Sequence, residues 1–141
     1  MGILFDGTNV WVTDDGSLKK LDPNGNVLQS VAVGTLPLFP VFDGSNIWVP
    51  NRNSNSVSVT RARDGQVLAT LTGNGLDQPI QAAFDGQRIL VTNINGSSAS
   101  LWKAADLTPL GSSVTGAFPA GACSDGINFW ITLTGTQLVR L

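Results

Sequence analysis

Histidine, tyrosine and glutamate do not occur in this sequence, and cysteine occurs only at position 123. A single cysteine cannot form a disulfide within the chain. Without histidine or a second cysteine, the common zinc and non-haem iron sites cannot be assembled. We therefore expect no metal site, no cofactor and no catalytic residue. Because a nucleophilic cysteine normally needs a neighbouring base, Cys123 is predicted to be a small buried apolar residue.

Long apolar runs and clusters of basic residues are also missing. No run approaches the roughly 18 apolar residues of a membrane span, and the start MGILFDG lacks the regions of a signal peptide. The eight basic residues and ten aspartates are scattered and give a net charge of -2. Nucleic-acid binding would need a basic patch, so we expect neither nucleic acid nor membrane as a partner.

One octapeptide recurs four times in the chain. It reads FDGTNVWV at 5–12, FDGSNIWV at 42–49, FDGQRILV at 84–91 and SDGINFWI at 124–131. From the first copy to the fourth, its aspartates are spaced by 37, 42 and 40 residues; they are Asp6, Asp43, Asp85 and Asp125. A period near 40 residues indicates one supersecondary unit per repeat.

Each unit consists of short strand patterns separated by turn signals. The second unit reads LFPVFDG, NIWVPN, SVSVTRARDG and QVLATLTG, with β-branched and aromatic residues in its strands. Asp-Gly pairs and Asn24-Gly25 favour tight hairpins, which predict an up-and-down antiparallel sheet. Because such a sheet cannot bury both faces alone, we predict an all-β fold, a β-propeller of four-stranded blades packed around an axis.

The single repeat domain, 1–141, divides into blades at approximately 1–36, 37–77, 78–117 and 118–141. The last unit ends with TQLVRL, so its outer strand is missing and we expect an open edge there. We favour a homodimer in which two chains meet head to tail in an eight-bladed ring. The alternatives are a four-bladed monomer and a portion of a longer propeller.

The stretches NIWVPNRNSNSVSVTRARDGQVLATLTGNG (46–75) and RILVTNINGSSASLW (88–102) resemble the YVTN family of β-propeller repeats, which also occurs in lactonase-like and surface-layer propellers. The motif FDGxNIWV is similar to repeats of virginiamycin B lyase-like proteins. The resemblance extends over the whole chain and implies a propeller, but such repeats serve enzymes, binding proteins and structural proteins alike. The lyases are taken to use histidine and a bound metal, so the resemblance does not imply that activity here.

Aromatic residues recur at equivalent positions of the repeats, and for these we predict packing between blades. They are Trp11, Trp48 and Trp130, together with Phe5, Phe42 and Phe84. Trp102 stands apart, because we place it level with Lys20, Thr60 and Arg140. We therefore expect it to point outward or into a gap of its own blade, packed or half-exposed, with an interface contact as the alternative.

The aspartates lie beside glycine or asparagine, where their side chains can bond to the backbone, so we predict turn formation for the four Asp-Gly pairs. Variable loops join the second and third strands of each unit, and such loops are common binding sites. Their amides, carboxylates and guanidinium group suit a carbohydrate or a protein ligand, with simple turn formation as the alternative. The candidate ligand-binding residues are Asp14, Asp15, Asn51, Arg52, Asn53, Asn55, Asn93 and Asn95.

Two functional classes are compatible with these residues. The first is a non-catalytic scaffold or binding module that assembles head to tail into a larger ring. The alternative is an enzyme or small-ligand-binding propeller with a site at the central tunnel. That alternative predicts acids or Arg52 converging near the axis.

Overall fold

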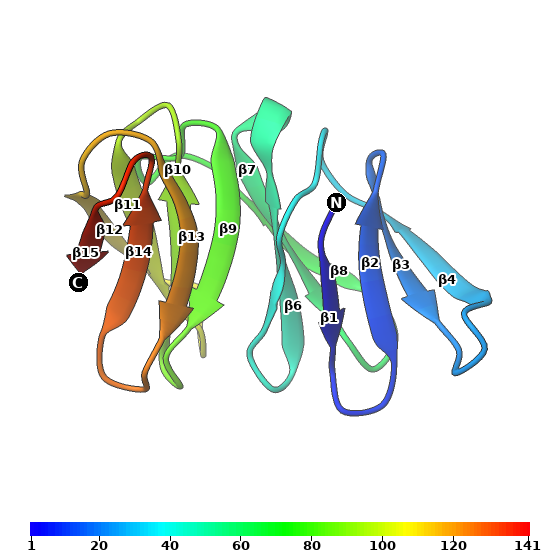
Figure 1. Cartoon of the computed structure of the whole chain (residues 1–141). Helices are drawn as coiled ribbons and strands as arrows, with labels where there is room; N and C mark the ends of the chain where they lie inside the picture. The colour runs from blue at the N-terminus through cyan, green and yellow to red at the C-terminus, as the bar shows by residue number, and fades with distance from the viewer.

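The computed structural model describes all 141 residues and contains fifteen strands in four antiparallel sheets (Figure 1). Strands lie side by side in the order of the sequence. The first sheet contains β1 (Ile3–Phe5), β2 (Val10–Asp14), β3 (Ser17–Leu21) and β4 (Val27–Ala32). The second contains β5 (Val41–Phe42), β6 (Asn46–Asn51), β7 (Ser56–Arg61) and β8 (Val67–Leu71).

The remaining two sheets follow the same plan. The third contains β9 (Pro79–Phe84), β10 (Arg88–Asn93), β11 (Ser98–Lys103) and β12 (Pro109–Val114). The fourth has three strands, β13 (Pro119–Ser124), β14 (Phe129–Leu133) and β15 (Leu138–Arg140). A single 3-10 turn, η1 (Arg52–Ser54), interrupts this all-β pattern, and no helix is long and apolar enough to cross a membrane. The four sheets are the predicted blades 1 to 4, so the all-β architecture and the three-stranded last blade are confirmed.

Asp-Gly turns join the first two strands of every blade. Their glycines, Gly7, Gly44, Gly86 and Gly126, have φ angles between 92° and 101°. An L-residue with a Cβ atom rarely adopts such angles, which explains the glycine in all four repeats. The three complete blades also share a register shift between their third and fourth strands, which bends the outer strand at the same place in each blade.

The core consists of three apolar clusters, and each cluster joins two consecutive blades. Alternation along the second strand gives every blade two faces. One face, which we call the tryptophan face, carries Trp11 in blade 1 and packs onto the next blade. The opposite face, which we call the valine face, carries Val49 in blade 2 and receives the tryptophan face of the preceding blade. Trp48 and Val91 repeat this arrangement between blades 2 and 3.

The four blades form an open arc rather than a closed ring. Figure 1 shows the N-terminal and C-terminal blades at opposite ends of the arc. No apolar cluster and no hydrogen bond joins blade 4 to blade 1. The alternative of a four-bladed ring closed within one chain is therefore wrong. Closure fails because the packing of the blades turns the chain through only part of a circle.

Two expectations about single residues need correction. Cys123 is exposed, not buried, because it lies on the tryptophan face of blade 4, which no neighbouring blade covers. Trp102 is packed, as one expectation had it, but it points neither outward nor into a gap of its own blade. It is almost fully buried, and its ring centroid lies 6.4 Å from that of Trp48 in the core between blades 2 and 3. Its pairing with Ile89 makes it equivalent to Thr60, which pairs with Ile47. In blade 1 the residue equivalent to Thr60 and Trp102 is Leu21, which pairs with Val10. Lys20 is the residue before it.

Candidate functional site

The Asp-Gly aspartates each accept several hydrogen bonds at one end of the blades. Asp43 Oδ1 accepts the backbone N–H groups of Ser45 and Asn46 at 2.9 and 2.7 Å, and its Oδ2 accepts the indole N–H of Trp48 at 2.8 Å. The same pattern recurs at Asp6 and Asp125. These aspartates therefore form the turns, as predicted, and they also fasten the tryptophans.

Blade 3 has leucine in place of the tryptophan and uses another donor. There Arg88 Nε donates to Asp85 Oδ2 at 2.7 Å. Partial burial raises the pKa of Asp85, but the N–H groups of Arg88 and Gln87 and the Arg88 guanidinium outweigh it and lower the pKa overall. Burial likewise raises the pKa of Asp6, but hydrogen bonds from Asn9, Trp11 and Thr8 lower it by more, so the pKa is lowered overall. These carboxyl groups are thus ionised structural acceptors at neutral pH.

At the opposite end of the blades, two of the predicted ligand-binding residues are not accessible. Asn51 and Asn93 are fully buried, and each amide donates to two serine hydroxyls of the adjacent strand. Asn51 donates to Ser56 at 3.1 Å and Ser58 at 2.9 Å. Their prediction as solvent-facing binding groups was wrong, because both are the last residues of inner strands and face the sheet interior.

The other predicted loop residues remain at the surface, and three of them contact residues 18 to 26 positions away in the sequence. Arg52 donates through Nε and Nη2 to Gln78 Oε1 at 3.3 and 3.1 Å, and Asn55 accepts the Gln78 N–H at 2.7 Å. The Asn95 amide donates to Asp77 at 2.9 Å, and Asp14 forms an ion pair with Lys19. Asp15 and Asn53 are exposed. The structure does not bring these residues into one cluster, and no three metal-ligating side chains gather anywhere in the chain.

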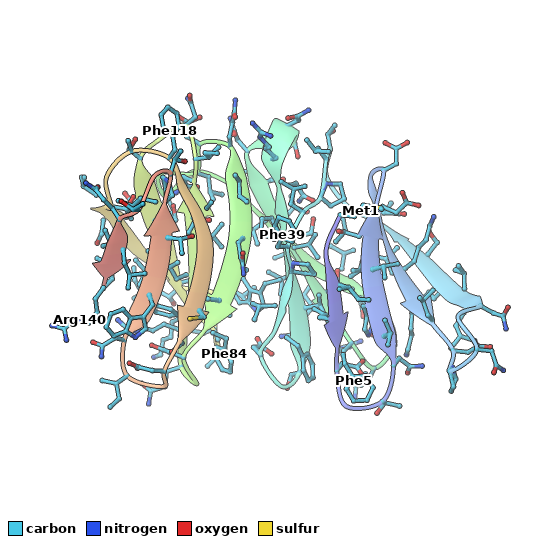
Figure 2. The ribbon with its side chains drawn as sticks, viewed as in Figure 1. Met1, Phe5, Phe39, Phe84, Phe118 and Arg140 are labelled. Carbon is cyan, nitrogen blue, oxygen red and sulfur yellow. The ribbon has the colours of Figure 1, made fainter.

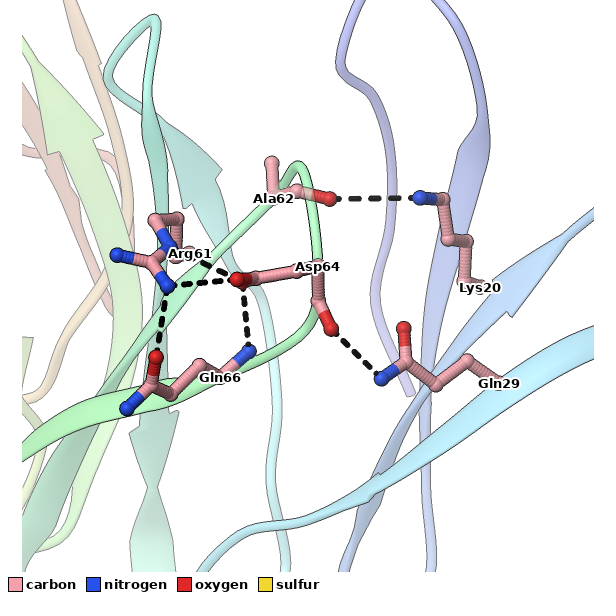
Figure 3. Close-up of polar contacts among 6 residues, drawn as sticks. All are labelled: Lys20, Gln29, Arg61, Ala62, Asp64 and Gln66. Carbon is pink, nitrogen blue, oxygen red and sulfur yellow. Dashed lines mark hydrogen bonds and ion pairs between the residues drawn. The ribbon is translucent and has the colours of Figure 1, made fainter.

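Polar contacts bridge neighbouring blades at the Asp-Gly end. Figure 3 shows the Gln29 amide donating to the Asp64 carbonyl at 2.9 Å and the Lys20 ammonium donating to the Ala62 carbonyl at 3.4 Å. Asp64 also forms a two-point ion pair with Arg61, whose hydrogen bonds lower the pKa of Asp64 to about 2. Sequence reasoning missed these contacts, because the two sides are more than thirty residues apart.

The two blade faces at the ends of the arc expose apolar side chains that would be buried at a junction between blades. Blade 1 leaves its valine face open, where Ile3 is 72% and Phe5 is 63% exposed. Blade 4 leaves its tryptophan face open, where Trp130 is only half-buried and Cys123 is exposed. In Figure 2, Arg140 lies at the left edge of the molecule and Phe5 lies right of centre, below β1. Because exposed apolar faces mark interaction surfaces, these two faces are the candidate functional site.

Comparison with known proteins supports the fold and leaves the family open. No protein-family model and no curated protein matches the chain. Among solved structures, the chain is similar to the hydrazine synthase of Kuenenia stuttgartiensis, with a TM-score of 0.86 and 19% identity over 99% of this chain and 45% of that chain. It therefore spans about half the length of that protein.

Two computationally designed proteins are also similar. For Ika8 the TM-score is 0.84 with 14% identity over 99% of this chain and 44% of that chain. For Ika4 the same TM-score and identity cover 88% of that chain. At such identities the likeness shows the fold alone, which is an arc of β-propeller blades.

Proposed function

We propose that this chain is a non-catalytic β-propeller scaffold or binding module whose two copies assemble head to tail into an eight-bladed ring. The observation that carries the proposal is the match between the two open faces. Each is one half of a junction that already occurs three times inside the chain. A junction of this kind is heterologous, and such contacts form a closed ring when their rotation closes.

Equivalent residues support this match position by position. Phe42 and Phe84 are equivalent to Phe5, and each packs into the cluster shared with the preceding blade. Phe5 lies in the first of the four blades and is exposed. Trp11 and Trp48 are fully buried by the following blade, whereas Trp130 is not. A partner's blade 4 would supply the missing cover for Phe5, and its blade 1 would cover Trp130.

Hydrogen bonds between neighbouring blades show the same difference between buried and open faces. The hydroxyl of Thr13 donates to the Leu38 carbonyl of blade 2 at 2.9 Å, and that of Thr92 donates to the Ala120 carbonyl of blade 4 at 2.9 Å. Thr132 is the equivalent residue in blade 4, yet its hydroxyl reaches only Gly121 of its own blade, at 3.4 Å. Head-to-tail assembly would give Thr132 the partner that its equivalents have.

The absolute mass in solution tests the proposal. Light scattering over a dilution series should give about twice the chain mass of 14.7 kDa at high concentration. The variant Ile3→Asp places a charge on the open face of blade 1 and should remain a monomer. Val114→Asp is the matched control, because Val114 is 85% exposed on the outer strand of blade 3, and this variant should assemble normally.

Two results would contradict the proposal. A monomer at every concentration would show that the open faces do not pair. Assembly that Ile3→Asp leaves intact would show that another surface forms the contact. The YVTN resemblance stays a prediction in either case.

A further inference from the structure

Two hollows at the Asp-Gly end of the blades occupy equivalent places in the repeat. The first lies between blades 1 and 2, has a volume of about 410 Å³ and is called the 1–2 hollow; its lining includes Asp6, Thr8, Phe42, Arg61 and Arg63. The second lies between blades 2 and 3, has a volume of about 670 Å³ and is called the 2–3 hollow; its lining includes Asp43, Ser45, Phe84, Arg88, Lys103 and Leu110. Both volumes lie in the range of about 300–1,000 Å³ typical of small-molecule sites.

Each hollow combines an aromatic ring with the same polar groups. Phe42 and Phe84 are half-buried, so part of each ring faces the hollow. Asp43 uses one lone pair of Oδ2 for Trp48 and two of Oδ1 for backbone N–H groups, which leaves one acceptor position of about four. The Ser45 hydroxyl makes no bond to the protein, although its backbone N–H bonds to Asp43. The hollow therefore offers both a hydrogen-bond acceptor and a free hydroxyl above an apolar ring.

The charges lining the hollows are balanced. In the 2–3 hollow, Arg88 lies 2.7 Å from Asp85 and Lys103 lies 3.9 Å from Asp106. In the 1–2 hollow, Arg61 is paired with Asp64, and Arg63 shares the lining with the carboxylate of Asp6. Arg63 has no ion-pair partner of its own, but an anionic ligand would need an excess of cations over carboxylates around the hollow. The balance favours a neutral ligand with many hydroxyls and an apolar face.

We propose that the 1–2 and 2–3 hollows are two equivalent subsites for the pyranose ring of a neutral sugar. The C–H face of the sugar would lie on Phe42 or Phe84, and its hydroxyls would bond to Asp6 with Thr8 or to Asp43 with Ser45. The site is at the opposite end of the blades from the asparagine-rich loops; Figure 2 shows Phe84 at this end and Phe118 at the other. Because each hollow is complete within one chain, the proposal does not depend on ring assembly.

The indole N–H groups beside these carboxylates give separate signals for the two hollows. Trp11 bonds to Asp6 and Trp48 bonds to Asp43, so each indole resonance in a ¹H–¹⁵N spectrum reports on one hollow. The probes are the methyl glycosides of glucose, galactose, mannose and N-acetylglucosamine, titrated at millimolar concentrations. At least one of these sugars should shift both resonances. Trp130 should stay unmoved in the monomer, because no blade follows it.

Substitutions then assign the binding to the rings. Phe84→Leu keeps an apolar side chain but removes the flat ring, and should weaken binding at the Trp48 signal about tenfold while leaving the Trp11 signal unchanged. Phe42→Leu should do the reverse. Phe39→Leu is the matched control, because Phe39 lines neither hollow, and should change neither.

Three outcomes would overturn the sugar proposal. In the first, none of the four glycosides shifts either indole. In the second, the shifts are indifferent to Phe42→Leu and Phe84→Leu. In the third, inorganic phosphate binds instead and Lys103→Ala abolishes that binding, which would identify an anion site. Ring assembly can succeed or fail independently of all three outcomes.

Discussion

Replacing Phe5 by alanine tests the head-to-tail junction quantitatively. An aromatic side chain has an area of about 150–250 Å², and Phe5 is 63% exposed in the single chain. Assembly would therefore remove about 100 Å² more apolar surface with phenylalanine than with alanine, worth about 2.5 kcal/mol per junction. A ring of two chains contains two such junctions, so the loss reaches about 4–5 kcal/mol, or roughly a thousandfold in the dimer dissociation constant.

Sedimentation equilibrium of Phe5→Ala and of the unchanged chain gives the two dissociation constants. The folded monomer should be hardly affected, because the side chain has little cover to lose, and thermal unfolding at high dilution checks this. Val114→Ala removes an exposed side chain away from both open faces and should leave the dissociation constant unchanged. A dimer whose dissociation constant Phe5→Ala changes less than about threefold, well under 1 kcal/mol, would refute the assigned junction.

Three further predictions concern other parts of the fold. Asp43→Ala should lower the free energy of unfolding by about 2 kcal/mol in urea titrations, because it leaves the indole N–H of the fully buried Trp48 without an acceptor; Asp15→Ala, at an exposed position, should have no effect. The free energy of unfolding should decrease as the pH drops below about 4. The folded chain lowers the pKa of aspartates such as Asp125, so in this pH range the unfolded chain binds more protons than the folded chain. Acid titration of unfolding should therefore show a smaller decrease for Asp125→Asn. The Cys123 thiol should react freely with a maleimide in dilute solution and become protected at concentrations where the ring forms, and equal rates at both concentrations would argue against burial of this face.

Much of the fold could be predicted from the sequence, because its signals are local. Asp-Gly turns and alternating strands depend on residues within a few positions of one another, so the four blades and the three-stranded last blade could be predicted. Trp102 was misplaced for a related reason. The loop before the third strand has two residues in blade 1 and four in blades 2 and 3, so distance along the chain does not reveal that Leu21, and not Lys20, is the equivalent of Trp102.

The candidate sites were harder to predict than the fold. Asparagine is common in binding loops, which is why Asn51 and Asn93 were predicted to bind a ligand. Their amides instead donate to serines of an adjacent strand, which the sequence alone did not indicate. The two hollows combine residues from neighbouring blades and have no contiguous motif. Only their repetition, with Phe42 and Phe84 at the same place, was visible in the sequence.

The repeated octapeptide by itself determined the strand order, the turns and the number of blades, since each follows from short-range backbone and side-chain chemistry. Only the tertiary structure decided that the arc stays open, which faces it leaves uncovered and why Cys123 is exposed. The physical reason is that the angle between blades depends on how side chains from distant segments pack together. The same residue type is buried at one blade and exposed at the next because its neighbour is present in one case and missing in the other.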